Sequence, residues 1–261
     1  MLVRDVGDAW QIVLQTDHAD LCGQMAAAWG GSGFARPEPF ESFVRAAARH
    51  DDGWAVWEQR PRIDSDGVPQ SFFAVPAPAH LAFYRAGVEV VCDEDPYAGL
   101  LVSMHMSGLY RNRYGVMPTP PRELADEVRP AVDAFVEQEQ QRQATLASEL
   151  EADEAQQWRN YALLQVLDVV SLYFGLADVE TGAEGGAEGV PTTADGDPTR
   201  IAISPLGPWR VRFDPYPFVE DTTSLTLKRR LVPKRGWADD DAFRTDLAAT
   251  PVETVRIFVQ R

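Results

Sequence analysis

The sequence is poor in cysteine. Only Cys22 and Cys92 occur among the 261 residues, and both stand in apolar surroundings. Two cysteines cannot form the dense disulfide framework of a small secreted domain. We therefore expect two buried free thiols in a reducing compartment.

Long hydrophobic runs are also lacking. The most apolar stretch, residues 163–177, is interrupted by Gln165, Asp168 and Ser171 and is too short to cross a bilayer. The first residues, MLVRDVGDAWQIV, have neither the basic start nor the apolar stretch of a secretory signal. These features predict a cytoplasmic protein that does not associate with membranes.

Positive charge is scarce. Lys and Arg number 24 against 40 Asp and Glu, a formal net charge of −16. Such a chain repels phosphate backbones and anionic lipid surfaces at long range, which excludes a general binder of nucleic acid polymers or membranes. A small anionic substrate remains compatible if a local cationic site holds it. The oligomeric state stays open.

A glycine-rich phosphate-binding loop is absent too. The glycine-rich segment GAEGGAEG, residues 182–189, has no Lys-Ser/Thr pair and follows no apolar strand-like run. This disfavours nucleotide-dependent kinases and dehydrogenases.

What the sequence does contain is mostly helical periodicity. Apolar residues recur at helical spacing in six segments, at about 16–29, 39–50, 76–87, 96–110, 122–157 and 158–176. Residues 178–199 are rich in glycine, proline and acid, which indicates a linker or long loop. Short alternating runs follow, such as SLTLKRRL and TVRIFVQ. We therefore predict a mainly α protein, with a helical domain at 1–177, the linker at 178–199 and a small antiparallel β element at 200–261.

Histidine is the informative residue, because there are only four. The adjacent pair His50-Asp51 closes one predicted helix, and His18 lies on the apolar stripe of an earlier one. Asp168 stands within the apolar segment LLQVLDVVSLYF, where an unpaired carboxylate is costly to bury. His80 and His105 also lie on apolar helical segments. Imidazole and carboxylate groups projecting from several helices can hold a first-row divalent ion. Helix capping by His50-Asp51, a core histidine at His18 and a salt bridge at Asp168 are the plainer alternatives.

The order H…HD…D in a helical context resembles the HD-domain superfamily of metal-dependent phosphohydrolases. The resemblance implies an HD-domain-like helical bundle in which His18, His50, Asp51 and Asp168 hold one metal ion. With His80 and His105 the pattern is that of binuclear members, in which Asp51 would bridge to a second ion held by those two histidines. One or two divalent ions per chain are therefore expected, with Mn, Fe, Zn, Co or Ni as candidates. The HDDGW sequence and the absence of a GYP signature depart from the cyclic-dinucleotide branch.

The chain as a whole is also similar to the DUF3891 family of uncharacterised bacterial proteins, a name that implies no function. The segments that carry this similarity are TDHADLCGQMAAAWG, RHDDGWAVWEQRP, HLAFYRAG, DPYAGLLVSMHMSGLY and LLQVLDVVSLYF.

Charged residues near the motif are candidates for further roles. Asp52 and Glu58 could, like Asp51, serve in acid–base catalysis or orient a ligand. Three arginines could clamp a phosphate: Arg49, Arg111 and Arg113. Ordinary surface positions are the alternative for all five.

The resemblance implies a phosphohydrolase that acts on a small phosphorylated or nucleotide-like substrate through metal-activated water. The same ligands would serve a di-iron oxygenase of HD type. A non-catalytic metal-binding scaffold of HD type is the third interpretation.

Overall fold

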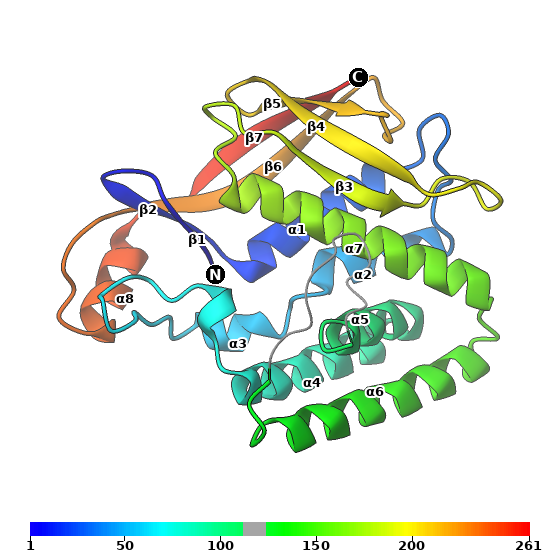
Figure 1. The fold of residues 1–261 in the computed structure, drawn as a ribbon, viewed down its shortest axis with the longest axis horizontal. Helices are drawn as coiled ribbons and strands as arrows, with labels where there is room; N and C mark the ends of the chain where they lie inside the picture. Colours follow the sequence, from blue (N-terminus) through cyan, green and yellow to red (C-terminus); the bar gives the residue numbers. More distant parts are fainter. Residues whose placement is uncertain (112–123) are drawn as a thin grey trace.

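The computed structural model describes residues 1–111 and 124–261. One sheet and a stack of helices make up this part of the chain (Figure 1). The strands are β1 (Leu2–Asp5), β2 (Ala9–Val13), β3 (Gly185–Val190), β4 (Thr199–Gly207), β5 (Arg210–Asp214), β6 (Thr222–Pro233) and β7 (Glu253–Gln260). The helices are α1 (Gln15–Ala28), α2 (Phe40–Arg49), α3 (Trp54–Glu58), α4 (Ala77–Glu94), α5 (Pro96–Gly108), α6 (Arg129–Glu149), α7 (Glu154–Leu176) and α8 (Asp240–Ala249), with a 3-10 turn at Phe72–Ala74.

The sheet has seven strands in the order β1-β2-β6-β7-β5-β4-β3. Every neighbouring pair is antiparallel except β5 and β7, which run parallel. Both ends of the chain therefore contribute to one mixed sheet, because the N-terminal strand β2 pairs with β6 near the C-terminus.

The prediction of a mainly α, HD-like bundle with a small C-terminal β element was wrong. The protein is α+β, and its sheet begins at β1 and includes β3, which lies within the glycine-rich stretch. The glycines permit close packing there: a Cβ on Gly185 would lie 2.6 Å from the Tyr173 ring of α7. Ala187 and Val190 are buried, so this stretch has an inward face despite its polar composition.

Helices cover one face of the sheet in successive layers (Figure 1). α1 packs on β6, and α7 packs on β1 and β3. α2 and α5 pack behind α1 and α7, and α4 and α6 pack on α5. α7 is apolar nearly all round from Tyr161 onward, because this part is covered by strands on one side and by helices on the other. No helix among the described residues combines the length and hydropathy that a bilayer crossing requires.

Candidate metal centre

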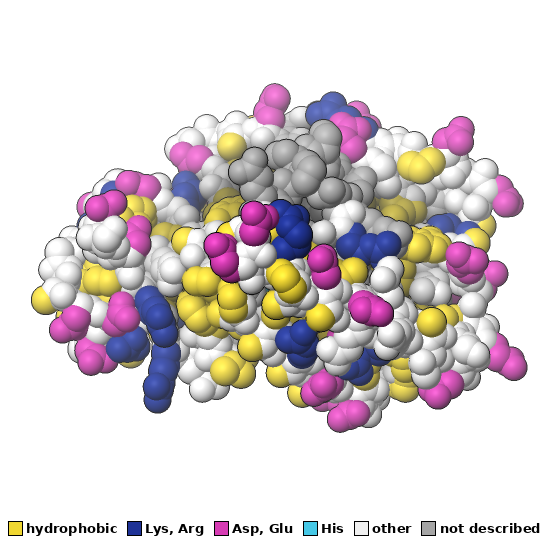
Figure 2. Space-filling view, turned by 60° about the horizontal axis from the view of Figure 1, so that its bottom comes forward, with side chains coloured by type: hydrophobic (Ala, Val, Ile, Leu, Met, Phe, Trp, Pro, Cys, Tyr) yellow, Lys and Arg dark blue, Asp and Glu magenta, His cyan; other side chains and the backbone are white. Residues whose placement is uncertain are grey.

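Five of the six predicted metal ligands meet between the inner helices. His18 comes from α1, His50 and Asp51 directly follow α2, His105 comes from α5 and Asp168 from α7. Their exposed fractions are 1%, 1%, 5%, 2% and 5%. On the face shown in Figure 2, outside the grey residues, no histidine side chain is visible, which agrees with this burial.

The helix packing explains how these residues meet. α1 and α2 cross closely, and a Cβ on Gly23 of α1 would lie only 2.5 Å from that of Ala48 of α2. α2 then ends in a turn in which Trp54 donates its backbone N–H to the carbonyl of Asp51. This turn directs His50 and Asp51 toward α1 and α7.

The nitrogen–oxygen separations within the cluster are short. His18 Nε2 lies 2.8 Å from Asp51 Oδ2. His50 Nε2 lies 3.6 Å from Asp168 Oδ1 and 3.8 Å from Asp51 Oδ2. His105 Nε2 lies 3.9 Å from Asp168 Oδ2. Two ligand atoms about 2.1 Å from one ion are about 3 Å apart at a right angle and about 4.2 Å apart on opposite sides. The spacing therefore fits donors that share a cation.

The surroundings of the two ring nitrogens of His50 also fit a metal ligand. His50 Nδ1 lies 2.9 Å from the carbonyl oxygen of Ala47, so it carries a proton and donates it. His50 Nε2 is buried and makes no hydrogen bond within the part of the chain that the structure describes. A backbone carbonyl behind one ring nitrogen, with the other nitrogen left to face the ion, is the usual arrangement of a metal-binding histidine.

His18 leads to the same conclusion through Ser171. The Ser171 hydroxyl donates to the carbonyl of Asp168 at 2.7 Å, so its oxygen accepts from His18 Nδ1 at 2.7 Å. A neutral His18 then presents a lone pair at Nε2, 2.8 Å from the carboxylate of Asp51. Two such acceptors can be this close only when a proton or a cation lies between them. The donor set therefore fits a divalent cation.

Charge interactions within the cluster shift several pKa values. Burial alone would lower the pKa of His50, but Asp51 and Asp168 outweigh it and raise the pKa to about 9. Burial, together with the charge of His50, lowers the pKa of His105 to about 4. Burial alone would raise the pKa values of Asp51 and Asp168, but the neighbouring histidines hold both below the usual range. The two carboxylates therefore stay ionised at neutral pH.

His80, the sixth predicted ligand, lies on α4. Its ring is 5.0 Å from that of Trp54 and stacks at 5.4 Å on Tyr84. Groups of at least three His, Cys, Asp or Glu side chains close enough to hold one ion occur twice among the described residues. They are His18-Cys22-His50 and His50-Asp51-His105, and neither includes His80.

The predicted catalytic carboxylates lie in different surroundings. Asp51 belongs to the cluster, whereas Asp52 is half-buried and accepts from Arg49 Nε at 2.5 Å. Glu58 is buried behind the cluster, where its Oε1 accepts from the Met1 amine at 3.1 Å and from the Gln15 backbone N–H at 2.7 Å.

The three predicted phosphate-binding arginines are dispersed. Arg49 also pairs with Glu94 of α4, so both of its carboxylate contacts lie away from the cluster. Arg111, at the end of α5, lines a small crevice with Met104 and Ser107. Arg113 lies outside the described residues.

The sequence interpretation did not single out three residues that support or border the cluster. Ser171 orients His18, and the Gln15 amide donates to Asp51 Oδ2 at 3.1 Å. Cys22 follows His18 by one helical turn. Gln15 precedes His18 by three residues and Ser171 follows Asp168 by three, so helical spacing from a candidate ligand is the signal that could have found them.

A comparison with protein families matches residues 1–234 to the model described as a protein of unknown function, DUF3891. The chain belongs to the DUF3891 family. No curated protein and no solved structure matches it. The matched range of this DUF3891 protein includes all five clustered side chains and the strands β1 to β6, and it ends before α8 and β7.

Proposed function

We propose that this protein is a metal-dependent hydrolase of HD type that cleaves a phosphoester bond in a small anionic substrate. The observation that carries the proposal is the meeting of His18, His50, Asp51 and Asp168 in one buried cluster, with His50 Nε2 open toward it. The order of these residues in the sequence is the H…HD…D order of that superfamily.

The charge of the cluster suits a divalent cation. Asp51 and Asp168 contribute two negative charges, and neutral imidazoles contribute none. One divalent cation would balance them, which is the usual way in which a buried carboxylate pair is stabilised. His18, His50, Asp51 and Asp168 would hold this ion, with His105 beside them. When bound, the ion would supply Lewis acidity and a water of lowered pKa.

The chain's own residues would position the reacting groups. Ser171 fixes the ring of His18, and the Ala47 carbonyl fixes that of His50. Gln15 fixes Asp51, and Glu58 in turn holds the backbone of Gln15. These contacts keep the donor atoms in place before any substrate arrives, which lowers the cost of reorganisation.

The substrate we propose is small and anionic. A chain of net charge −16 attracts an anion only through a local positive field, and a cation in the cluster would provide one. Arg111 lies three residues after the end of α5, the helix that carries His105, so we propose it as a contact for the substrate's negative charge. Both cysteines are free, which suits a protein that works in a reducing cytoplasm.

The test is metal analysis of the full chain beside phosphoester hydrolysis. We expect one or two transition-metal ions per chain and hydrolysis of at least one member of a panel of phosphomonoesters, phosphodiesters and nucleotides. The double variant His50→Ala/Asp51→Ala should lose the metal and at least about a hundredfold in rate. Asp52→Ala is the matched control, since this neighbouring acid pairs with Arg49 outside the cluster.

The number of ions tests His80 separately. If a second ion is held by Asp51, His80 and His105, the variant His80→Ala should reduce two ions per chain to one. A wild-type chain that takes up no ion after incubation with Mn²⁺, Fe²⁺ or Zn²⁺ would overturn the proposed function.

A further inference from the structure

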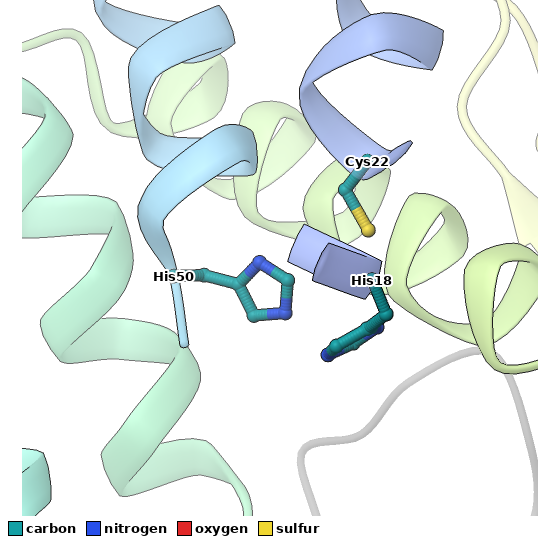
Figure 3. Close-up of side chains that lie close together, drawn as sticks. All are labelled: His18, Cys22 and His50. Atoms are coloured by element: carbon teal, nitrogen blue, oxygen red, sulfur yellow. The ribbon is translucent and has the colours of Figure 1, made fainter. Parts of the chain in front are cut away.

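A sulfur atom borders the cluster. Cys22 lies on α1 four residues after His18, so the two side chains share one face of the helix. Its side chain is fully buried. Figure 3 shows the thiol pointing toward the space between His18 and His50, and the His50 ring pointing toward the same space.

The donor atoms lie close enough together to hold one ion. One donor atom each from His18, Cys22 and His50 lie within 4.8 Å of one another. A sulfur about 2.3 Å from a tetrahedral zinc ion and a nitrogen about 2.1 Å from it are about 3.6 Å apart. A closing movement of at most about 1.2 Å in any pair would therefore bring all three donors onto one ion. His50 Nε2, buried without a hydrogen bond, is an independent sign that this space receives a ligand.

The other cysteine provides a natural comparison. Cys92 lies on α4 and is free and partly buried like an ordinary helix thiol. Its charged neighbours include Arg142 and Glu139 of α6, whereas those of Cys22 are Asp168 and Asp51 of the cluster. The two cysteines therefore differ in surroundings, which makes Cys92 a matched control.

We infer that Cys22 is a sulfur ligand of the centre, which then joins nitrogen, oxygen and sulfur donors. This inference rests on the proposed metal centre and extends it. When the ion binds, the S–H bond of Cys22 breaks, the proton leaves to solvent and the thiolate donates an electron pair to the ion. Thiolate favours Zn²⁺, Fe²⁺ and Co²⁺ over Mn²⁺ and Mg²⁺, so the centre selects among metals through this residue.

The first experiment is absorption spectroscopy of the full chain loaded with Co²⁺. We expect a near-ultraviolet sulfur-to-cobalt charge-transfer band in the wild type and in Cys92→Ser, and its loss in Cys22→Ser. The Zn²⁺ affinity should also fall by at least about tenfold in Cys22→Ser, with a smaller change for Mn²⁺. Circular dichroism of each variant checks that it folds.

X-ray absorption of the zinc-loaded wild type needs no variant. A sulfur neighbour at about 2.3 Å supports the inference, and a shell of nitrogen and oxygen alone overturns it. A cobalt band that persists in Cys22→Ser overturns it as well. If Co²⁺ binds at one ion per chain without the band, this inference fails while the proposed function stands. If no ion binds, both fail.

Discussion

His50 is the residue at which proton and metal binding compete. Without a bound cation, Asp51 and Asp168 overcome the effect of burial and raise the pKa of His50 to about 9. The ring is then protonated at neutral pH, and a metal ion must displace that proton. His105, whose pKa is lowered to about 4, is neutral over the same range and adds no proton to the exchange.

We therefore predict that metal affinity rises with pH. The variant Cys22→Ser has no thiol proton to release, so it isolates the proton of His50. In this variant the apparent affinity for Zn²⁺ should increase about tenfold per pH unit between pH 6 and 8 and level off near pH 9. Competition titrations measure the affinity. Calorimetry in buffers of different ionisation enthalpy measures the number of protons released on binding. We expect close to one proton per bound ion.

An affinity that stays flat from pH 6 to 8 would mean that His50 is neutral without the ion and would contradict this balance. Gln15→Ala is a useful companion variant, because it removes a hydrogen bond to Asp51 but no charge. The Zn²⁺ affinity of this variant should be lower at every pH, but it should rise with pH as steeply as before.

At the scale of single residues, the sequence contained the cluster but not its supports. Asp168 was recognisable because a carboxylate in an apolar helix needs a partner, and His50-Asp51 because the two are adjacent. Ser171 and Gln15 were not, since hydroxyl and amide side chains are common on helices. Only the packing of α1 against α7 and α2 brings Ser171 to His18 and Gln15 to Asp51. From the sequence, Arg49 was a reasonable candidate for an anion contact. In the structure its guanidinium pairs with Asp52 and Glu94 instead.

At the scale of elements, the crossing of α1 and α2 sets the distance between His18 and His50. The crossing is close because Gly23 has no side chain: an added Cβ would lie 2.5 Å from Ala48 Cβ and 3.0 Å from its Cα. Non-bonded carbon atoms do not pack at 2.5 Å, so the helices would have to separate.

We predict that Gly23→Ala weakens metal binding from a distance. Overpacking should lower the free energy of unfolding by about 1–3 kcal/mol, partly offset by up to about 1 kcal/mol from the higher helix propensity of alanine. Because His18 moves away from His50, the affinity for Zn²⁺ should fall as well. Urea unfolding and metal titration measure the two effects.

Gly236→Ala is the control for this substitution, since a Cβ at Gly236 meets nothing within 4 Å. It should leave both quantities unchanged. If Gly23→Ala keeps the wild-type affinity, the crossing does not set the geometry of the centre.

The helices and the strands near the C-terminus were largely predictable, whereas the extension of the sheet through β1, β2 and β3 was not, for a physical reason. α2 carries apolar residues at a helical spacing that the chain shows locally, and α5 is buried continuously from Tyr97 to Gly108. β3 has only Ala187 and Val190 facing inward, and its strand conformation depends on pairing with β4 and on close contact with α7. β1 and β2 are four and five residues long, too short for alternation to stand out.

At the scale of the whole molecule, β7 holds the sheet together. It is the fourth of seven strands and pairs with β6 on one side and β5 on the other. Two inward side chains, Ile257 and Val259, are fully buried in the main core. α1 packs on β6, on one side of β7, whereas α7 packs on β3, on the other side, and on β1, so both helices that bring ligands rest on a sheet that β7 makes continuous.

We therefore predict that a chain ending at residue 234 cannot form the centre, although the family match ends there. Removing β7 leaves the facing edges of β5 and β6 unpaired and exposes core side chains, so the sheet divides into two pieces and α7, which packs on β1 and β3, loses the continuous sheet that supports it. The truncated chain should lack a cooperative urea transition, as followed by circular dichroism, and should retain less than about a tenth of the wild-type metal. A milder variant, Ile257→Ala, should keep the fold, lower the free energy of unfolding by about 2–5 kcal/mol and leave the metal content unchanged. If the 234-residue chain unfolds cooperatively and binds metal like the full chain, the helical layers are an independent domain and the sheet has no part in positioning the centre.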